Sequence, residues 1–320
     1  MFQKRERMID RKTFLIVGFG GMGCRHAQSL IDANSDSLVY IFEPNDKIYE
    51  SNLDLIGQSM NNKVHRLSNF DQINFKIDFC VVATSSEPRF EILMELLDYE
   101  IPHFLVEKVV FQSDSQFKNL KKSLGREKIF VNFVNRYFET YIDIKKGIRK
   151  RPFSIDVIGG DFGLGCNALH YFDLFKYFGG KDPVLSNFSL SEDSRGNKRG
   201  SSYKEFEGQI SIEDKQGSTL NISSDLGRLG DVEILIKYSD RTHFINEGLL
   251  KEIRYFRNKI ITKPLTIHYT SKLTAKIYRD ICESNCLLPT ISNTEDIHQI
   301  LFESINKSLN VKLNEKCPIT

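Results

Sequence analysis

The sequence has no tryptophan, little net charge and no long apolar segment. Its 44 basic and 42 acidic residues leave a formal net charge of +2, which argues against a nucleic-acid partner. A transmembrane helix needs about 18 or more consecutive apolar residues, and no apolar run approaches that length. The first residues are charged and lack the apolar region of a secretory signal peptide. We therefore expect a cytoplasmic protein that contacts neither nucleic acid nor membrane.

Cysteine is also scarce, and the spacing of its six residues does not suit a metal site. Only Cys282 and Cys286 lie close together, and no second pair completes a zinc site. Free thiols in a reducing compartment are the simplest interpretation. We therefore expect no bound metal.

The most informative segment is TFLIVGFGGMG, which runs from Thr13 to Gly23. A short apolar run that ends in G-x-G-x-x-G and enters a helix is typical of a dinucleotide-binding turn. Its glycines let the backbone approach a pyrophosphate, and the helix N-terminus offers free amides and a partial positive charge. We expect cofactor-binding residues at Gly18, Phe19, Gly20, Gly21, Met22 and Gly23.

Glu43 stands at the end of the next apolar run, residues 38–42, and 20 residues after Gly23. A carboxylate at that place accepts hydrogen bonds from ribose hydroxyls and repels a 2′-phosphate, so Glu43 favours NAD(H) over NADP(H). The alternative is a solvated glutamate beside an ordinary turn, which the glycine pattern disfavours.

The length of 320 residues suits two domains, which we place at residues 1–130 and 131–320. Strand-like and helix-like segments alternate in the first, which predicts an α/β fold with a doubly wound parallel sheet, the Rossmann arrangement. The expected strands are 13–17, 38–42, 64–67, 79–83, 104–106 and 129–133, and the expected helices are 22–33, a segment from Pro88, and 113–124.

The second domain shows alternating strands separated by turn signals, which predicts an α+β fold with an open, mostly antiparallel sheet. We expect strands at 153–158, 206–212, 219–223 and 232–238, and helices at 167–178, 271–283 and 294–309. Ser292 and Glu295 have the spacing of a capping box for the last helix. The polar segment 192–204 is expected to form a loop.

Polar residues gather where a doubly wound sheet binds its ligands, at the carboxyl ends of the strands. Thr84 and Ser85 follow the fourth expected strand, and Glu107 and Lys108 follow the fifth. The sixth strand leads into residues 132–136. Beyond it, His170 and Asp173 lie three residues apart on one face of the helix 167–178.

Taken in order, these motifs resemble the glucose–fructose oxidoreductase, inositol dehydrogenase and MocA (Gfo/Idh/MocA) family of nicotinamide-dependent oxidoreductases. The resemblance runs from GFGGMG through ATSS, VEK and NR at Asn135 and Arg136 to NALHYFD around His170. It implies hydride transfer between NAD and a hydroxyl or carbonyl carbon of a sugar, cyclitol or nucleotide-sugar, in a homo-oligomer such as a dimer or tetramer. Similarity to members with a Cys-Asn-x-x-His segment points to carbohydrate or surface-glycan biosynthesis.

The resemblance also implies roles for single residues. Lys108 and His170 match the family's catalytic lysine and histidine, and Asp173 matches an aspartate one turn further on; we expect all three to be catalytic. A neutral imidazole can accept the hydroxyl proton, and an ammonium can stabilise the developing alkoxide. We assign cofactor contacts to Thr84, Ser85, Glu107, Lys108 and Arg136, and substrate contacts to Lys108, Asn135, Cys166, Asn167 and His170.

Two positions depart from the family pattern. Val109 replaces the proline of its E-K-P motif, and Cys166 stands where members often carry an aspartate, four residues before His170. A thiol supplies no fixed negative charge at neutral pH unless its pKa is strongly lowered. Either Lys108 and His170 work without that charge, or Asn167 binds substrate instead, or catalysis is weakened. A nucleophilic Cys166 lacks a paired base at this spacing.

Each candidate also has a purely structural interpretation. Lys108 could be a solvated loop lysine, and His170 could be a core histidine among apolar neighbours. Asp173 could orient His170 or pair with a cation, and Thr84 and Ser85 could cap the next helix. Three of the cations in the loop 192–204 suit either a solvated surface or the phosphates of a nucleotide, namely Arg195, Lys198 and Arg199.

Two rival functions fit the same fold. One uses tightly held NAD for a transient oxidation, so that epimerisation, elimination or glycoside cleavage proceeds without release of NADH. The other is a non-catalytic NAD(H)-binding regulator, which the absence of the usual aspartate favours.

Overall fold

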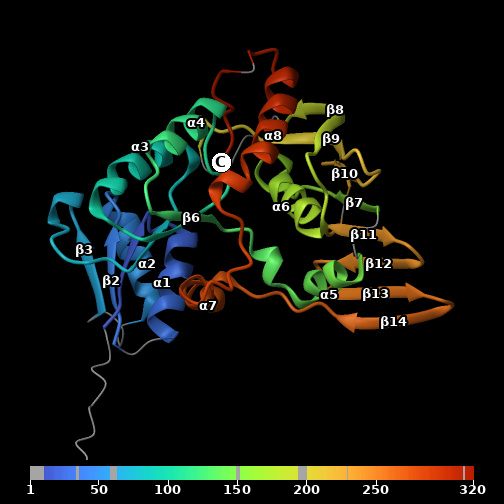
Figure 1. Ribbon diagram of the computed structural model, residues 1–320. Coiled ribbons are helices and arrows are strands. Elements are labelled where there is room, and N and C mark those ends of the chain that lie inside the picture. The colour runs from blue at the N-terminus through green and yellow to red at the C-terminus, as the bar shows by residue number, and fades with distance from the viewer. Residues whose placement is uncertain are drawn as a thin grey trace, which may run out of the picture.

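The computed structural model describes residues 11–33, 36–57, 63–148, 152–193, 200–228, 230–312 and 314–320. Figure 1 shows two sheets, one in the blue and green first part of the chain and one mainly in its yellow and orange part, with helices between them. The cations expected in the loop 192–204, Arg195, Lys198 and Arg199, lie outside the described residues.

The first sheet has six parallel strands in the order β3-β2-β1-β4-β5-β6. Its central strands are apolar and buried, as a parallel sheet covered on both faces requires. The strands are β1 (Thr13–Val17), β2 (Leu38–Phe42), β3 (Val64–Leu67), β4 (Phe79–Val82), β5 (His103–Val106) and β6 (Lys128–Val131). This order confirms the predicted Rossmann arrangement and puts the ligand-binding switch point between β1 and β4.

The helices of this sheet are α1 (Gly21–Ala33), α2 (Asp46–Ile56), α3 (Ser86–Leu96) and α4 (Asp114–Ser123). The sequence analysis found α1, α3 and α4 but not α2. Ile56 is the one buried residue of α2, so the helix lacks the apolar stripe that marks a helix in sequence. Its start is instead fixed by Asn45, whose side chain accepts a hydrogen bond from the Ile48 amide at 3.2 Å.

The second sheet is mixed and mostly antiparallel, with the order β14-β13-β12-β11-β7-β10-β9-β8. Only the neighbouring strands β7 and β10 are parallel among its described pairings. The strands are β7 (Phe153–Gly159), β8 (Val184–Glu192), β9 (Phe206–Glu213), β10 (Thr219–Ser224), β11 (Glu233–Tyr238), β12 (Arg241–Asn246), β13 (Lys251–Phe256) and β14 (Lys259–Pro264). The α+β prediction is therefore confirmed, although β8, β12, β13 and β14 were not anticipated.

Three helices lie on the side of the second sheet that faces the first sheet (Figure 1), namely α5 (Glu139–Ile148), α6 (Leu164–Phe178) and α8 (Glu295–Ser308). Helix α6 begins three residues before its predicted start, after Gly163 in the left-handed region at φ 71°. In the described part of the chain, every helix is too short or too polar to cross a membrane.

After β14 the chain returns to the first sheet. Helix α7 (Thr270–Cys282) packs against α1, where the Thr274 hydroxyl lies 2.8 Å from His26 Nδ1 and the Ala275 amide donates to Ser29. The Val131 amide then donates to Pro289 O at 3.0 Å. The domain boundary between residues 130 and 131 stays a prediction. The structure adds that α7 and the segment after it, which come late in the sequence, pack against the first sheet and its helix α1.

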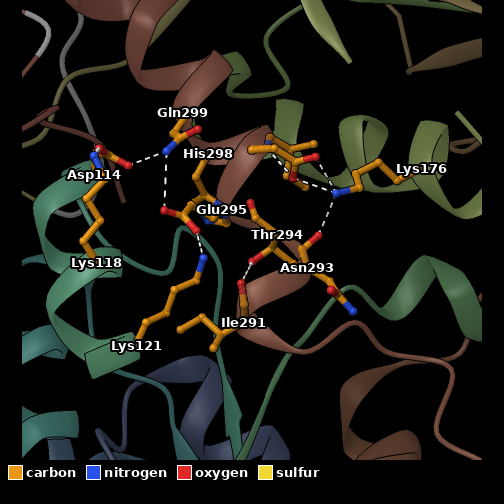
Figure 2. Close-up of polar contacts among 12 residues, drawn as sticks. Asp114, Lys118, Lys121, Lys176, Ile291, Asn293, Thr294, Glu295, His298 and Gln299 are labelled. Atoms are coloured by element: carbon orange, nitrogen blue, oxygen red, sulfur yellow. Dashed lines mark hydrogen bonds and ion pairs between the residues drawn. The ribbon is translucent and has the colours of Figure 1, made fainter. Parts of the chain in front are cut away.

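Helix α8 joins both halves of the molecule by charged side chains (Figure 2). Glu295 pairs with Lys121 of α4, whereas Lys176 of α6 binds Asp296 at 2.5 Å and the Asn293 carbonyl at 2.8 Å. The predicted capping box is wrong, because α8 begins only at Glu295 and Thr294 is its N-cap. Ser292 lies in the 3-10 turn before it.

Candidate active site

The turn between β1 and α1 has the geometry that a pyrophosphate requires. Gly18 adopts φ +84°, and a Cβ at Gly23 would lie 1.9 Å from Gly18 O, so both positions demand glycine. Gly20 and Gly21 have no atom within 4 Å of where a Cβ would stand. The backbone at the start of α1 is therefore open to a ligand, at the end of the helix that attracts anions.

A groove of about 750 Å³ continues from this turn along the carboxyl ends of the central strands. Glu43 and Lys108 both line it. Of the expected cofactor residues, the groove is lined by Gly18, Gly20, Gly21, Met22, Glu43, Thr84, Ser85, Glu107 and Lys108. Phe19 and Gly23 lie beneath it, since the Phe19 side chain is buried and Gly23 packs on Gly18.

Glu43 is held rigidly at the end of β2. Its Oε2 accepts a hydrogen bond from the Phe19 amide at 2.9 Å, and its Oε1 accepts one from the Asn45 amide at 3.0 Å. The Phe19 amide is thus used within the protein and is not offered to a phosphate. The carboxylate is fixed on the wall of the groove, as a ribose-binding acid must be.

Thr84 and Ser85 present polar atoms to the same groove. The Thr84 hydroxyl is buried and has no hydrogen-bond partner within the described residues. Ser85 is the N-cap of α3, but its side chain makes no capping hydrogen bond. A buried hydroxyl without a partner in a groove wall fits a polar ligand, so these residues, the open glycine turn and Glu43 together suit NAD.

Lys108 connects the groove to the second half of the molecule. Its Nζ donates to Asn167 Oδ1 at 2.9 Å, and it lies 3.0 Å from Cys166 Sγ and 3.2 Å from the Cys166 carbonyl oxygen. Lys108 is partly buried, which excludes a solvated loop lysine. The Lys108–Val109 peptide bond, at the place of the family's proline, is cis.

Glu107 supplies a fixed negative charge next to Lys108. Burial alone would raise the pKa of Glu107, but hydrogen bonds from His26 and Asn132 and the charge of Lys108 lower it to about 2. The Asn132 amide donates to Glu107 Oε1 at 2.6 Å, and His26 Nε2 lies 3.0 Å from the same oxygen. Because α7 orients His26 through Thr274, the second half of the chain helps to place this carboxylate.

Arg89 is the main residue of the groove that the sequence analysis missed. Its side chain is 1% exposed, and its guanidinium donates to the carbonyl oxygens of Thr84, Glu107, Val109 and Val110. These carbonyls belong to the two loops that follow β4 and β5. Arg89 therefore ties the loop of Lys108 to the loop of Thr84.

His298 of α8 supports the same loop from the other side. Its Nε2 accepts a hydrogen bond from the Val110 amide at 3.2 Å, and its Nδ1 lies 2.8 Å from Thr294 O. These partners require a neutral ring that is protonated on Nδ1. Burial, with a contribution from the charge of Arg89, lowers the pKa of His298 to about 4, so the neutral form is present at pH 7.

His170 lines a second cavity, of about 240 Å³. The other lining residues are Asn135, Phe162, Asn167, Tyr171, Val232 and Glu247. The Nδ1 atom of His170 is buried and has no partner among the described residues. Burial, together with the charge of Lys108, lowers the pKa of His170 to about 3, so its imidazole is neutral at pH 7. A neutral ring with a free nitrogen can accept a proton from a ligand.

Arg136 and Asp173 form a buried pair, and their expected roles stay predictions. They were expected at the cofactor and in catalysis, but they bind one another through two hydrogen bonds of 2.8 Å and 2.7 Å. Neither lines the groove or the cavity. Asp173 is only 1% exposed, and Arg136 also donates to Leu287 O. Asp173 thus pairs with a cation, one of the two structural interpretations considered for it.

The position of the family's aspartate is occupied by the Cys166 thiol, and the carboxyl group of a different residue, Glu205, interacts electrostatically with Lys108. Glu205 caps α6, accepting hydrogen bonds from the Gly165 and Phe206 amides. Burial raises the pKa of Glu205, and the charge of Lys108 opposes that rise. Because Glu205 lies 39 residues beyond Cys166, no local spacing could have revealed it.

Comparison with known protein families gives one match, over residues 12–133, to the oxidoreductase family with an NAD-binding Rossmann fold whose model is named GFO_IDH_MocA. No curated protein sequence matches the chain.

Solved structures extend the fold similarity to nearly the whole chain. An oxidoreductase from Agrobacterium radiobacter in complex with NAD+, L-tartaric acid and magnesium is 13% identical at a TM-score of 0.73, with 94% of this chain and 97% of that one covered. The UDP-N-acetylglucosamine 3-dehydrogenase GnnA from Acidithiobacillus ferrooxidans is 13% identical at 0.70, over 94% and 98%. A super-repressor mutant of Gal80p from Saccharomyces cerevisiae is 13% identical at 0.69, over 94% and 96%.

The matched segment contains the glycine turn, Glu43, Arg89 and Lys108, and the structural similarity spans the second sheet and α6 as well. Residues 12–133 therefore match the oxidoreductase family with an NAD-binding Rossmann fold, GFO_IDH_MocA, and the solved structures show the same overall fold for nearly the whole chain.

Proposed function

We propose that the protein transfers a hydride between NAD and a hydroxyl or carbonyl carbon of a sugar, cyclitol or nucleotide-sugar, with a role in carbohydrate or surface-glycan biosynthesis. The observation that carries the proposal is the link from Lys108, in the wall of the groove, to Asn167, in the wall of the His170 cavity. The UDP-N-acetylglucosamine dehydrogenase among the similar structures supports the sugar class.

The glycine turn, Glu43, Thr84 and Ser85 would hold NAD, whose nicotinamide ring supplies hydride chemistry when bound. Lys108 binds the substrate oxygen and stabilises negative charge that develops on it. His170 takes the hydroxyl proton in oxidation and returns it in reduction. Burial and, to a lesser extent, the Lys108 ammonium keep His170 neutral, so oxidation starts with the imidazole ready to accept a proton.

Arg89, His298 and Glu107 act as positioning residues in this proposal. Arg89 and His298 hold the backbone of the Lys108 loop, and the charges of Glu107 and Lys108 interact. Reaction requires the reacting atoms to be held within about 3.5 Å of one another. A loop that is fixed from two sides can hold Lys108 in such a position.

The experiment compares Lys108→Met and His170→Asn with the wild type, in hydride transfer to a panel of sugars and nucleotide-sugars and in NADH binding followed by fluorescence. Each variant should lose turnover and keep its NADH affinity. In Lys108→Met the pKa of His170 should also rise by about one unit, because a positive neighbour is removed. Histidine NMR measures that rise. Full activity of either variant would overturn the assignment.

A second candidate is a regulator that binds NAD(H) without hydride transfer, favoured by Cys166 at the position of the family's aspartate and by fold similarity to Gal80p. Tight NADH binding by the wild type with no transfer to any member of the panel would support it. A third reaction class, transient oxidation on retained NAD, would show turnover without net NADH release.

A further inference from the structure

Glu247 lies in the tight turn after β12 and reaches the cavity that contains His170. No motif of the sequence marks this residue. Glu247 carries the one carboxyl group among the seven residues that line this cavity. Whatever enters the cavity therefore meets a single fixed acid.

Two tyrosines hold the Glu247 carboxyl group. Tyr141 OH donates to Oε1 at 3.3 Å, and Tyr171 OH donates to Oε2 at 3.5 Å. Tyr141 and Tyr171 are almost fully buried, and burial keeps both phenols protonated by raising their pKa well above its usual value. Each carboxylate oxygen accepts only one of these bonds and keeps capacity for a further donor.

Burial raises the pKa of Glu247, and the two tyrosine hydrogen bonds oppose that rise. Glu247 is half-buried and forms no ion pair within the described residues, so a ligand that donates hydrogen bonds to its carboxylate would stabilise the charged form. A second anion in the same small cavity would be repelled instead. The chemistry of the cavity thus selects by charge.

We infer that Glu247 determines substrate specificity by binding hydroxyl or ammonium donors next to the reacting carbon and by excluding carboxylate and phosphate groups from this cavity. The inference rests on the proposed function, because it places the reacting carbon near His170. The cavity volume of about 240 Å³ is that of roughly eight water molecules, which suits one compact polar ring. An anionic part of a substrate must therefore lie elsewhere, towards the groove.

Three probes of nearly equal shape test this inference by binding, without need of turnover. D-glucose is neutral, D-glucosamine carries an ammonium and D-glucuronate carries a carboxylate. Each is titrated into the NADH-saturated protein, and binding is followed by ligand-observed NMR and thermal shift. We expect the wild type to bind glucosamine and glucose, and to bind glucuronate at least tenfold more weakly.

Glu247→Gln keeps the size of the side chain and removes its charge. It should weaken glucosamine binding at least tenfold and strengthen glucuronate binding. Glu303→Gln, on the exposed side of α8 where Glu303 pairs with Lys307, is the matched control and should behave as the wild type. NADH affinity equal to that of the wild type shows that each variant is folded.

Several results would overturn the inference: equal binding of glucuronate by the wild type, an unchanged order of probes in Glu247→Gln, or binding of none of the three. The order of the three affinities in the wild type tests the inference even if Glu247→Gln does not fold. If the wild type did not bind NADH, the proposed function itself would be refuted. If it bound NADH but did not distinguish the probes by charge, only the role of Glu247 would be refuted.

Discussion

Asp173 offers the sharpest test of how this site is built, because sequence and structure give it different roles. The resemblance makes it a catalytic residue, whereas the structure makes it the partner of Arg136. Replacing Asp173 by asparagine keeps the shape and removes the charge. If the structural role is correct, Asp173→Asn should lose stability and keep turnover.

The magnitude follows from the burial of the pair. Asp173 is 1% exposed and the Arg136 side chain 14%, so water cannot replace a lost partner. Breaking a buried ion pair by neutralising one member typically costs about 3–5 kcal/mol. Asparagine can still accept one hydrogen bond, so we expect the lower end, ~3 kcal/mol.

The assay is urea unfolding, which we would monitor by circular dichroism and tyrosine fluorescence because the chain has no tryptophan. The double variant Arg136→Leu/Asp173→Leu provides the control. It removes both charges, and replacement of a buried pair by apolar residues often restores much of the stability. A large loss of kcat in Asp173→Asn with unchanged stability would refute the structural role.

Further predictions concern the cofactor and pH. In fluorescence titrations, Glu43→Gln should reduce the ratio of the Kd for NADPH to the Kd for NADH by about tenfold, which is ~1.4 kcal/mol. A wild-type preference for NADPH would contradict the role of Glu43. Stability should fall as pH drops from 6.5 towards 4, because His298 and His170 are held neutral in the fold with pKa values of about 4 and 3 and must charge in acid. A second loss of stability should follow below pH 4.5. The pKa of Glu107 is lowered to about 2 in the fold, so its stabilising contribution is complete only above its ordinary pKa and is lost as the pH falls towards 2. We would measure the free energy of unfolding by chemical denaturation across this pH range. In His298→Gln this free energy should fall less steeply between pH 6.5 and 4 than in the wild type, and an equal slope would contradict the prediction.

The parts of the fold that were predictable are those whose signal is local. The glycine turn, Glu43 and the buried strands of the first sheet follow from short patterns of glycines and apolar residues. The strands β12, β13 and β14 carry little such signal, since all six residues of β14 are exposed. Pairing with β13, and not burial, maintains β14 in the sheet.

The residues of the site divide in the same way. Lys108, Asn167 and His170 could be named because each lies in a recognisable motif. Glu205 and Glu247 could not, because they reach the site across sequence separations that no spacing rule covers. Arg89 was hidden for another reason: it lies at the start of a helix, where an arginine is ordinarily a solvated residue, and only the fold shows the carbonyls around it.

The position of Lys108 relative to His170 depends on contacts far from both. Lys108 belongs to the loop after β5, and His170 belongs to α6, so their approach requires the two sheets to keep a fixed relation. That relation is maintained by α7 on α1 and by α8, whose acids bind Lys121 on one side and Lys176 on the other (Figure 2). Since α8 also carries His298, which holds the Val110 amide, the helix that joins the two halves also supports the loop of Lys108. The electrostatic coupling between Lys108 and His170 is therefore set by the packing of the carboxyl-terminal helices as well as by the loop and helix that carry the two residues.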